Sequence, residues 1–252
     1  MTRRIAAALT AGCLIAAGLR AQTPRVAAWS SYEGVTNSED WSTAGAQFTL
    51  AAARGSAGWV AGERVGRFGA TDLTARVGGV LHPTERWWIT AEAGTATDPE
   101  FMPKNSWEVD VAALVGRRAS FGLGYRRRNY VVGPVDFLMP HLTVDLHAIS
   151  WDLRAFISRN PSDRTDAAFS LRATTALTGR VTAWVLGAAG RESFLVGTPP
   201  TAQVRSLDTV TGAAGLRCNA GSGFTLRIEA DVVRSRPVLS RRGGGIGIER
   251  QF

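Results

Sequence analysis

GGGIGIERQF, residues 243–252, ends the chain with a clean alternation of side-chain types. In an extended strand, successive side chains point to opposite faces. Ile246, Ile248 and Phe252 therefore share one face, whereas Glu249 lies on the other. The stretch predicts a strand with an apolar face and a polar face.

The same period of two recurs along the chain, and it is clearest at residues 224–232. Other segments with good alternation are residues 47–52, 72–81, 87–93, 107–115, 120–126, 149–157 and 169–174, and weaker ones are residues 59–68, 135–146 and 180–192. Counted from residues 25–35 to residues 243–252, the segments predict fourteen strands. Without the weak first segment and one partner of the tight turn near Gly69, the number is twelve.

The breaks between these segments differ in length. Short breaks are expected at residues 54–57, 82–85, 116–119, 177–180 and 219–223 and near His147, and longer ones at residues 36–40, 97–106, 131–134, 159–164, 196–206 and 235–242. Short turns at one end and longer loops at the other are typical of an outer-membrane barrel, with tilted strands of about 9 to 11 residues. An even strand number places both termini at the short-turn end.

A soluble β-sandwich also alternates, so the composition of the two faces has to decide. One face is built from Ala, Val, Leu and Ile, with Trp41, Trp59, Trp87 and Trp107 towards segment ends, as lipid and interfacial girdles require. The other face carries charges on almost every strand, which a sandwich core could not hold unpaired. We expect an all-β, antiparallel, up-and-down transmembrane β-barrel. A periplasmic β-sandwich binding module is the alternative.

The first residues have the features of a secretory signal peptide. Arg3 and Arg4 precede an apolar stretch at residues 5–19, and the small Ala21 follows. We expect residues 1–21 to be cleaved and residues 22–252 to form one barrel domain in the bacterial outer membrane. The expected partners are outer-membrane lipids, the barrel assembly machinery and periplasmic chaperones. Phe252 resembles the terminal aromatic that serves as an assembly signal in such barrels.

The charges of the chain limit the partners and the kind of lumen that can be expected. Without residues 1–21 the chain has 26 basic and 21 acidic residues, a net charge of +5. The arginines are dispersed among acids, so nucleic acid is not an expected partner. The residues expected to face the lumen are Asp72, Arg76, Glu92, Glu108, Asp110, Arg126, Arg128, Asp152, Arg154, Arg172, Arg217, Arg227, Glu229 and Asp231. Seven of these are basic and seven acidic, which predicts a lumen balanced in charge.

Residues suited to catalysis are few. The expected mature chain has three histidines, His82, His141 and His147, and one cysteine, Cys218. We expect His82 to be a turn or interface residue, beside Pro83. About six residues of strand keep the other two histidines too far apart to share a metal ion. No catalytic residue, cofactor or metal site is expected. The alternative is a lipid-modifying hydrolase that uses a histidine with Ser120 or Ser150.

Several short motifs, in order, resemble the YaiO-type outer-membrane β-barrel family. They are Arg67-Phe68-Gly69, Leu81-His82-Pro83, Phe101-Met102-Pro103 and Gly124-Tyr125-Arg126. His82 and Arg250 stand where that family often has aromatics. The resemblance implies a barrel without an established catalytic activity, from a family whose members are sometimes linked to cell-surface polysaccharide systems. We therefore expect a narrow channel or a surface structural component for small polar solutes or glycan.

Overall fold

The computed structural model describes residues 23–36, 38–52, 55–161, 164–196, 203–236 and 239–252. The predicted signal peptide, residues 1–21, lies outside them. Within these ranges no helix is long and apolar enough to cross a membrane.

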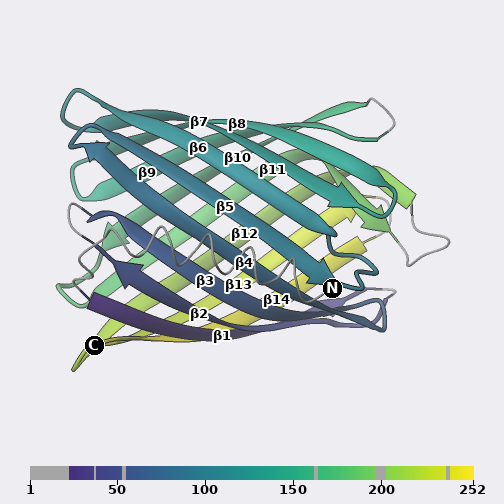
Figure 1. The fold of residues 1–252 in the computed structure, drawn as a ribbon, viewed down its shortest axis with the longest axis horizontal. Helices are drawn as coiled ribbons and strands as arrows, with labels where there is room; N and C mark the ends of the chain where they lie inside the picture. The colour runs from purple at the N-terminus through teal and green to yellow at the C-terminus, as the bar shows by residue number, and fades with distance from the viewer. Residues whose placement is uncertain (1–22, 37, 53–54, 162–163, 197–202, 237–238) are drawn as a thin grey trace, which may run out of the picture.

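The described residues form fourteen antiparallel strands that close into one barrel (Figure 1). The strands are β1 (Thr23–Val35), β2 (Trp41–Ala51), β3 (Ala57–Arg67), β4 (Ala70–Thr84), β5 (Trp87–Thr97), β6 (Asn105–Val115), β7 (Ala119–Tyr130), β8 (Gly133–Leu146), β9 (Ile149–Arg159), β10 (Thr165–Ala176), β11 (Val181–Val196), β12 (Gln203–Gly221), β13 (Phe224–Arg236) and β14 (Leu239–Gln251). Each pairs with its neighbours in sequence, and β1 pairs with β14. The prediction of a fourteen-stranded barrel is confirmed, and the twelve-stranded and sandwich alternatives are wrong.

The two ends of the barrel differ in their connections. We call the end that carries the β2–β3 and β4–β5 turns and Phe252 the turn end, and the opposite end, with the β1–β2 and β5–β6 connections, the loop end. The difference in length is smaller than predicted, because only residues 131–132 join β7 to β8 and only residues 237–238 join β13 to β14. The expected strand length of about 9 to 11 residues was too short for most strands, which have 11 to 19 residues.

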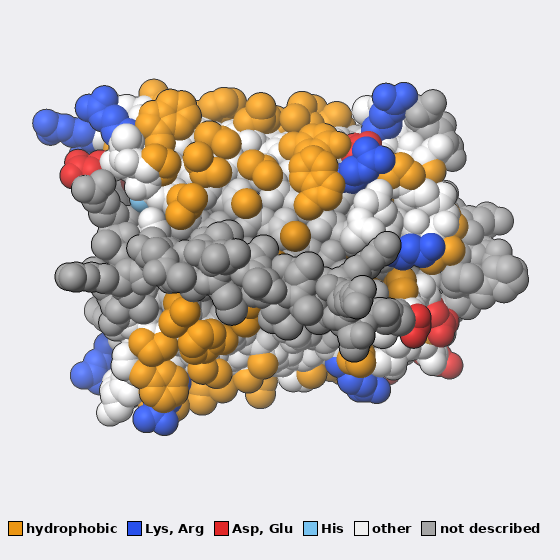
Figure 2. Space-filling view, in the orientation of Figure 1, with side chains coloured by type: hydrophobic (Ala, Val, Ile, Leu, Met, Phe, Trp, Pro, Cys, Tyr) orange, Lys and Arg blue, Asp and Glu red, His pale blue; other side chains and the backbone are white. Residues whose placement is uncertain are grey.

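The outer surface is an apolar belt. Leucine, valine, isoleucine and phenylalanine side chains are exposed on the outside of the strands, and charged side chains gather at the two ends of the barrel (Figure 2). Trp87 and Trp107, 50% and 42% exposed, lie on this surface as expected. The expectation for Trp41 and Trp59 was wrong. Trp41 is only 5% exposed, and Trp59 bonds to a glutamate inside the barrel.

Inward tryptophans lie flat against the barrel wall because the neighbouring strand offers a glycine. A Cβ at Gly45 would come within 2.5 Å of the Trp29 ring, and a Cβ at Gly78 within 2.6 Å of the Trp59 ring. Glycine within a strand marks such a close approach. The indoles therefore pack against the glycines of the neighbouring strand.

This packing predicts the effect of Gly78→Val. The new side chain would displace the Trp59 ring from its place against β4. We expect the free energy of unfolding to fall by about 1–3 kcal/mol, the usual cost of overpacking. The midpoint of urea unfolding in detergent measures it. Gly58→Val is the matched control, because a Cβ at Gly58 meets only the Gly78 carbonyl at 3.8 Å; equal midpoints for the two variants would contradict the packing account.

The glycines of β14 have a related role. A Cβ at Gly243 would meet Glu33 Cγ at 2.6 Å, and a Cβ at Gly245 would meet Glu229 Oε1 at 3.2 Å. The glycine run thus leaves room on the inner wall for acidic side chains of the two neighbouring strands. It does so on the strand that closes the barrel.

Candidate functional site in the barrel lumen

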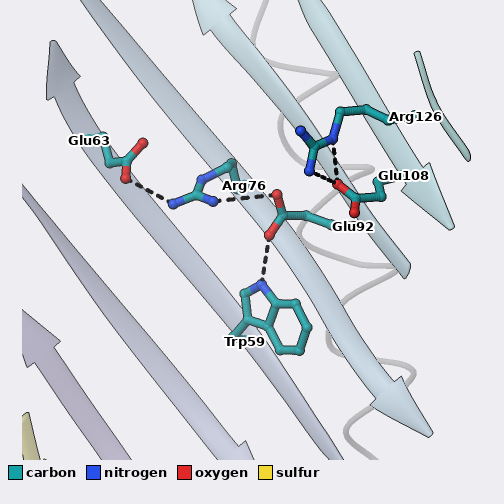
Figure 3. A network of polar contacts seen from close by, with 6 residues as sticks. All are labelled: Trp59, Glu63, Arg76, Glu92, Glu108 and Arg126. Carbon is teal, nitrogen blue, oxygen red and sulfur yellow. Dashed lines mark hydrogen bonds and ion pairs between the residues drawn. The ribbon is translucent and has the colours of Figure 1, made fainter. Parts of the chain in front are cut away.

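A chain of polar contacts runs along the inner wall from β3 to β5 (Figure 3). The Arg76 guanidinium on β4 lies 2.8 Å from Oε1 of Glu63 on β3 and 3.4 Å from Oε1 of Glu92 on β5. The indole Nε1 of Trp59 donates a hydrogen bond of 3.1 Å to the other oxygen of Glu92. One arginine thus serves two carboxylates, so this part of the wall is locally acidic.

A separate ion pair lies beside this chain, on β6 and β7. Glu92 and Glu108 face each other across the β5–β6 ladder, a position where like charges repel. Glu108 has its own arginine, because Arg126 Nε donates to its Oε2 at 2.6 Å. Each carboxylate is therefore paired with a cation, which makes the juxtaposition tolerable (Figure 3).

The β5–β6 connection is anchored inside the loop end by Asp72. This carboxylate has no exposed surface, and it accepts hydrogen bonds from the backbone N–H groups of Glu100, Phe101 and Met102 at 2.9, 3.1 and 2.7 Å. Phe101 is 4% exposed. Since Asp72 points inward from β4, the connection occupies part of the loop-end mouth.

A cation–aromatic cluster lies beside this anchored connection. The guanidinium carbons of Arg67 and Arg241 each lie 4.5 Å from the centroid of the Trp41 ring, at a distance typical of cation–π attraction. Arg241 Nη1 is also 2.6 Å from Oε2 of Glu33. Arg67 lies 5.9 Å from the Phe101 ring, so the cluster reaches the connection that Asp72 holds.

The turn end carries a different arrangement. Arg217 and Arg227, both expected in the lumen, approach the same carboxylate, Glu249, at 3.5 and 3.2 Å. Between this region and the Arg76 network lies a cavity of about 400 Å³, whose lining includes Arg76, Arg227 and Glu229. The lumen therefore contains space bordered by charged side chains from opposite parts of the sequence.

Five more of the predicted lumen residues have separate surroundings. Asp152 accepts a hydrogen bond of 3.1 Å from the Thr143 hydroxyl. Arg154 faces His141 in the β8–β9 ladder. The Arg172 guanidinium stacks 4.6 Å from the centroid of Trp184, and that of Arg128 lies 5.6 Å from the centroid of Phe137. Asp231 lies against Gly243, with Oδ1 3.1 Å from where a Cβ would stand.

His141 and Asp110 form a pair on the inner wall. The His141 ring passes over Gly122 of β7, and its Nε2 lies 3.0 Å from Asp110 Oδ2 on β6. The other ring nitrogen, Nδ1, is buried without a hydrogen-bond partner. A serine triad needs a hydroxyl at that nitrogen. In the described part of the chain, neither Ser120 nor Ser150 is bonded to His141.

The other two histidines are elsewhere. His82 stacks on Trp88, with ring centroids 6.3 Å apart, and lies within β4, so its prediction as a turn residue was wrong. His147 lies in the β8–β9 turn with a φ of 56°. Among the described residues, no three His, Cys, Asp or Glu side chains come together as metal ligands would.

Comparison with known proteins places the fold. No family model and no curated protein sequence matches the chain. Omp33, an outer membrane protein of Acinetobacter baumannii, superposes with a TM-score of 0.55 at 12% identity, over 92% of this chain and 100% of that chain. The monoaromatic hydrocarbon channel CymD superposes with a TM-score of 0.60 at 8% identity, over 92% and 89%. The chain thus shares its fold with outer-membrane β-barrels.

A third similar structure is described as a bacterial polysaccharide outer membrane secretin. It superposes with a TM-score of 0.56 at 9% identity, over 91% of this chain and 98% of that chain. The superpositions show a common architecture, but the sequence identities are low. The chemistry of this lumen therefore has to be derived from its own residues.

Several lumen residues were missed in the sequence. They are Arg25, Glu33, Glu63, Arg67 and Arg241. Glu63 was missed because the outer face of β3 is made mostly of glycines and Arg64, which hides the alternation. The tight turn at Phe68 and Gly69 could have revealed it. That turn pairs Arg67 with Ala70, and this register puts Glu63 on the same face as Arg76.

Outside the strands, Asp40 has the clearest electrostatic environment. Its pKa is lowered, first by the hydrogen bond from the Tyr32 hydroxyl and then by one from the backbone N–H of Val35. A lowered folded pKa means that the ionised carboxylate stabilises the β1–β2 connection at neutral pH, and that this stabilisation is lost as pH falls through the folded pKa. Asp40 therefore holds the start of β2 against the end of β1.

Proposed function

We propose that the protein is a non-enzymatic outer-membrane channel with a narrow lumen for small polar solutes. The observation that carries the proposal is the water exposure of charges inside a closed barrel. The side chains of Arg217 and Arg227 are 48% and 58% exposed, although both strands face the lumen at these positions. Charges buried without water would be too costly, so the exposure of these two side chains supports a water-filled lumen.

An apolar outer belt supports the membrane location. Leu153, Phe169 and Ile228 are 46%, 59% and 50% exposed on the outside, and a chain in water would not leave so many such side chains uncovered. Closed barrels are one of the two architectures that satisfy all backbone groups in lipid. The similar structures include outer-membrane proteins and one channel, which agrees with this assignment.

Membership of the YaiO-type family is part of this proposal. It rests on the order of the short motifs and on the barrel architecture. A link to surface polysaccharide would follow from it, and the lumen side chains, which are largely Arg, Asp and Glu, suit hydroxyl-rich solutes.

Export by a cleaved signal peptide gives a direct prediction. We expect the protein isolated from outer membranes to begin near Gln22, because the apolar stretch and Ala21 fit signal peptidase processing. N-terminal sequencing measures this. Recovery of the chain with Met1 intact, or from a fraction released without detergent, would contradict the assignment.

Liposome swelling tests the channel itself. Liposomes that contain the refolded barrel should swell in neutral sugars, at rates that fall steeply as the sugar becomes larger. Heat-denatured protein is the control. For the hydrolase alternative, purified wild type and His141→Ala should both leave phospholipid and lipid A unchanged; turnover that disappears in the variant would favour an enzyme instead.

A further inference from the structure

Three arginines converge on one carboxylate at the turn end of the lumen. Arg227 Nη2 lies 3.2 Å from Oε2 of Glu249, and Arg217 Nη2 lies 3.5 Å from Oε1. Arg25 Nη1 lies 4.0 Å from the same Oε1. The three side chains come from β13, β12 and β1, so they approach from both sides of β14. We call these four residues the Glu249 cluster.

The Glu249 cluster has an excess of positive charge. Three guanidiniums against one carboxylate leave a net charge of +2. Arg217 and Arg227 also face each other directly in the β12–β13 ladder, where like charges repel. Among the described residues, the ion pairs of these arginines go to Glu249 alone. One carboxylate cannot neutralise the group, so the cluster retains an attraction for a second anion.

Unused donors in the Glu249 cluster face water. Each guanidinium has five N–H donors in a planar fork, and Glu249 occupies only a small part of them. The arginine side chains are 40%, 48% and 58% exposed, whereas Glu249 is 13% exposed. The carboxylate is thus at the base of the cluster, and the guanidiniums stand above it towards the lumen.

A fourth arginine lies beyond the Glu249 cluster, on β10. Arg172 on β10 stacks on Trp184 of β11, and the Trp184 ring in turn lies over Gly215. Gly215 is two residues from Arg217 on the same inward face of β12. The basic side chains therefore come from β10, β12, β13 and β1, near the turn end of each strand.

We propose that the Glu249 cluster is an anion-binding subsite at the turn-end mouth of the lumen. It takes the carboxylate or phosphate group of a small solute, because guanidinium forks bind both groups in a bidentate manner. This inference rests on the proposed channel function for its role in transport. The binding itself does not depend on conduction, so the two can fail separately.

Isothermal titration calorimetry with inorganic phosphate tests the subsite in detergent-solubilised wild type at low ionic strength, where screening is weak. We expect binding to the wild type, and a loss of affinity of at least about tenfold in the double variant Arg217→Gln/Arg227→Gln, as the loss of charged hydrogen bonds implies. Arg117→Gln, which changes an exposed arginine in the turn joining β6 and β7, should bind as the wild type does. A titration with acetate distinguishes a carboxylate from a phosphate preference.

Glu249→Gln should change the phosphate affinity in the opposite direction. It raises the net charge of the cluster, so phosphate affinity should increase severalfold. Arg25→Gln, near the start of β1, supplies a second loss variant if the double variant does not fold, as judged by heat-modifiable gel mobility. No phosphate or acetate binding to the wild type, or equal affinity in all folded variants, would overturn the proposal. Reversal potentials then link the subsite to permeation. The wild type, Arg117→Gln and Glu249→Gln should be selective for anions, and the variants that lack arginines of the cluster should not be.

Discussion

Asp72→Ala is expected to open the loop end of the barrel and to lower its stability. Without the carboxylate, the backbone N–H groups of Glu100, Phe101 and Met102 lose their acceptors, and the β5–β6 connection can leave the mouth. A hydrogen bond to a charged group contributes about 1.5–3 kcal/mol. Since water replaces some of the lost bonds, we expect a decrease of about 3 kcal/mol in the free energy of unfolding.

Two measurements check the Asp72 prediction. Single-channel conductance should increase in Asp72→Ala, and the urea midpoint should decrease. Glu100→Ala is the matched control, because it removes a carboxylate from the same connection while the backbone N–H that bonds to Asp72 remains. Unchanged conductance together with an unchanged midpoint in Asp72→Ala would show that the connection is not held by this carboxylate.

Deletion of Phe252 is expected to reduce the amount of assembled barrel severalfold. In the folded protein, the Phe252 N–H donates to the Pro24 carbonyl at 3.0 Å, and the ring, 60% exposed, lies under Arg250 with a separation of 4.7 Å. These contacts lie at the seam where β14 meets β1. The ladder between the two strands begins at Gln251 and does not need Phe252, so the finished barrel should be stable without it.

The Phe252 deletion is checked by quantifying the heat-modifiable form in outer-membrane fractions. Phe252→Tyr keeps an aromatic ring and should assemble normally. The smaller amount of assembled deletion protein should conduct as the wild type does, because the residue contacts neither lumen cluster. Normal outer-membrane levels of the deletion would contradict its role as an assembly signal.

The fold could be predicted from the sequence because period two is a local property. The alternation in the last strand and in residues 224–232 identifies both faces directly. The ends of the strands were harder to predict. Residues 235–242 contain Pro237 and several arginines, which suggested a loop, yet most of this stretch continues β13 and β14. Water beyond the lipid lets strand ends carry charge without a desolvation penalty.

The arrangement within the lumen could be predicted only in part. Parity along a strand indicated that Arg76, Glu92 and Arg126 share the inner face with other charges. It could not show that Asp72 would hold a backbone segment about thirty residues away, since such contacts depend on how the connection folds back. The inward turn of Trp59 also depends on a neighbour, Gly78, that only the register identifies.

The distribution of charge within the lumen could not be predicted from the sequence either. The predicted count of equal acids and bases describes the lumen as a whole and hides its local differences. Arg76 serves two carboxylates, whereas Glu249 is surrounded by three arginines. A solute crossing the barrel would therefore meet an acidic wall and a basic mouth in succession.

Single-channel recording in a planar bilayer tests the central claim most directly. Refolded wild type, shown to be heat-modifiable on gels, should give discrete current steps whose size increases with salt concentration. Addition of the Asp72→Ala protein in a separate experiment should give larger steps. Insertion of folded wild type without any current steps across a range of salts would contradict a water-filled channel.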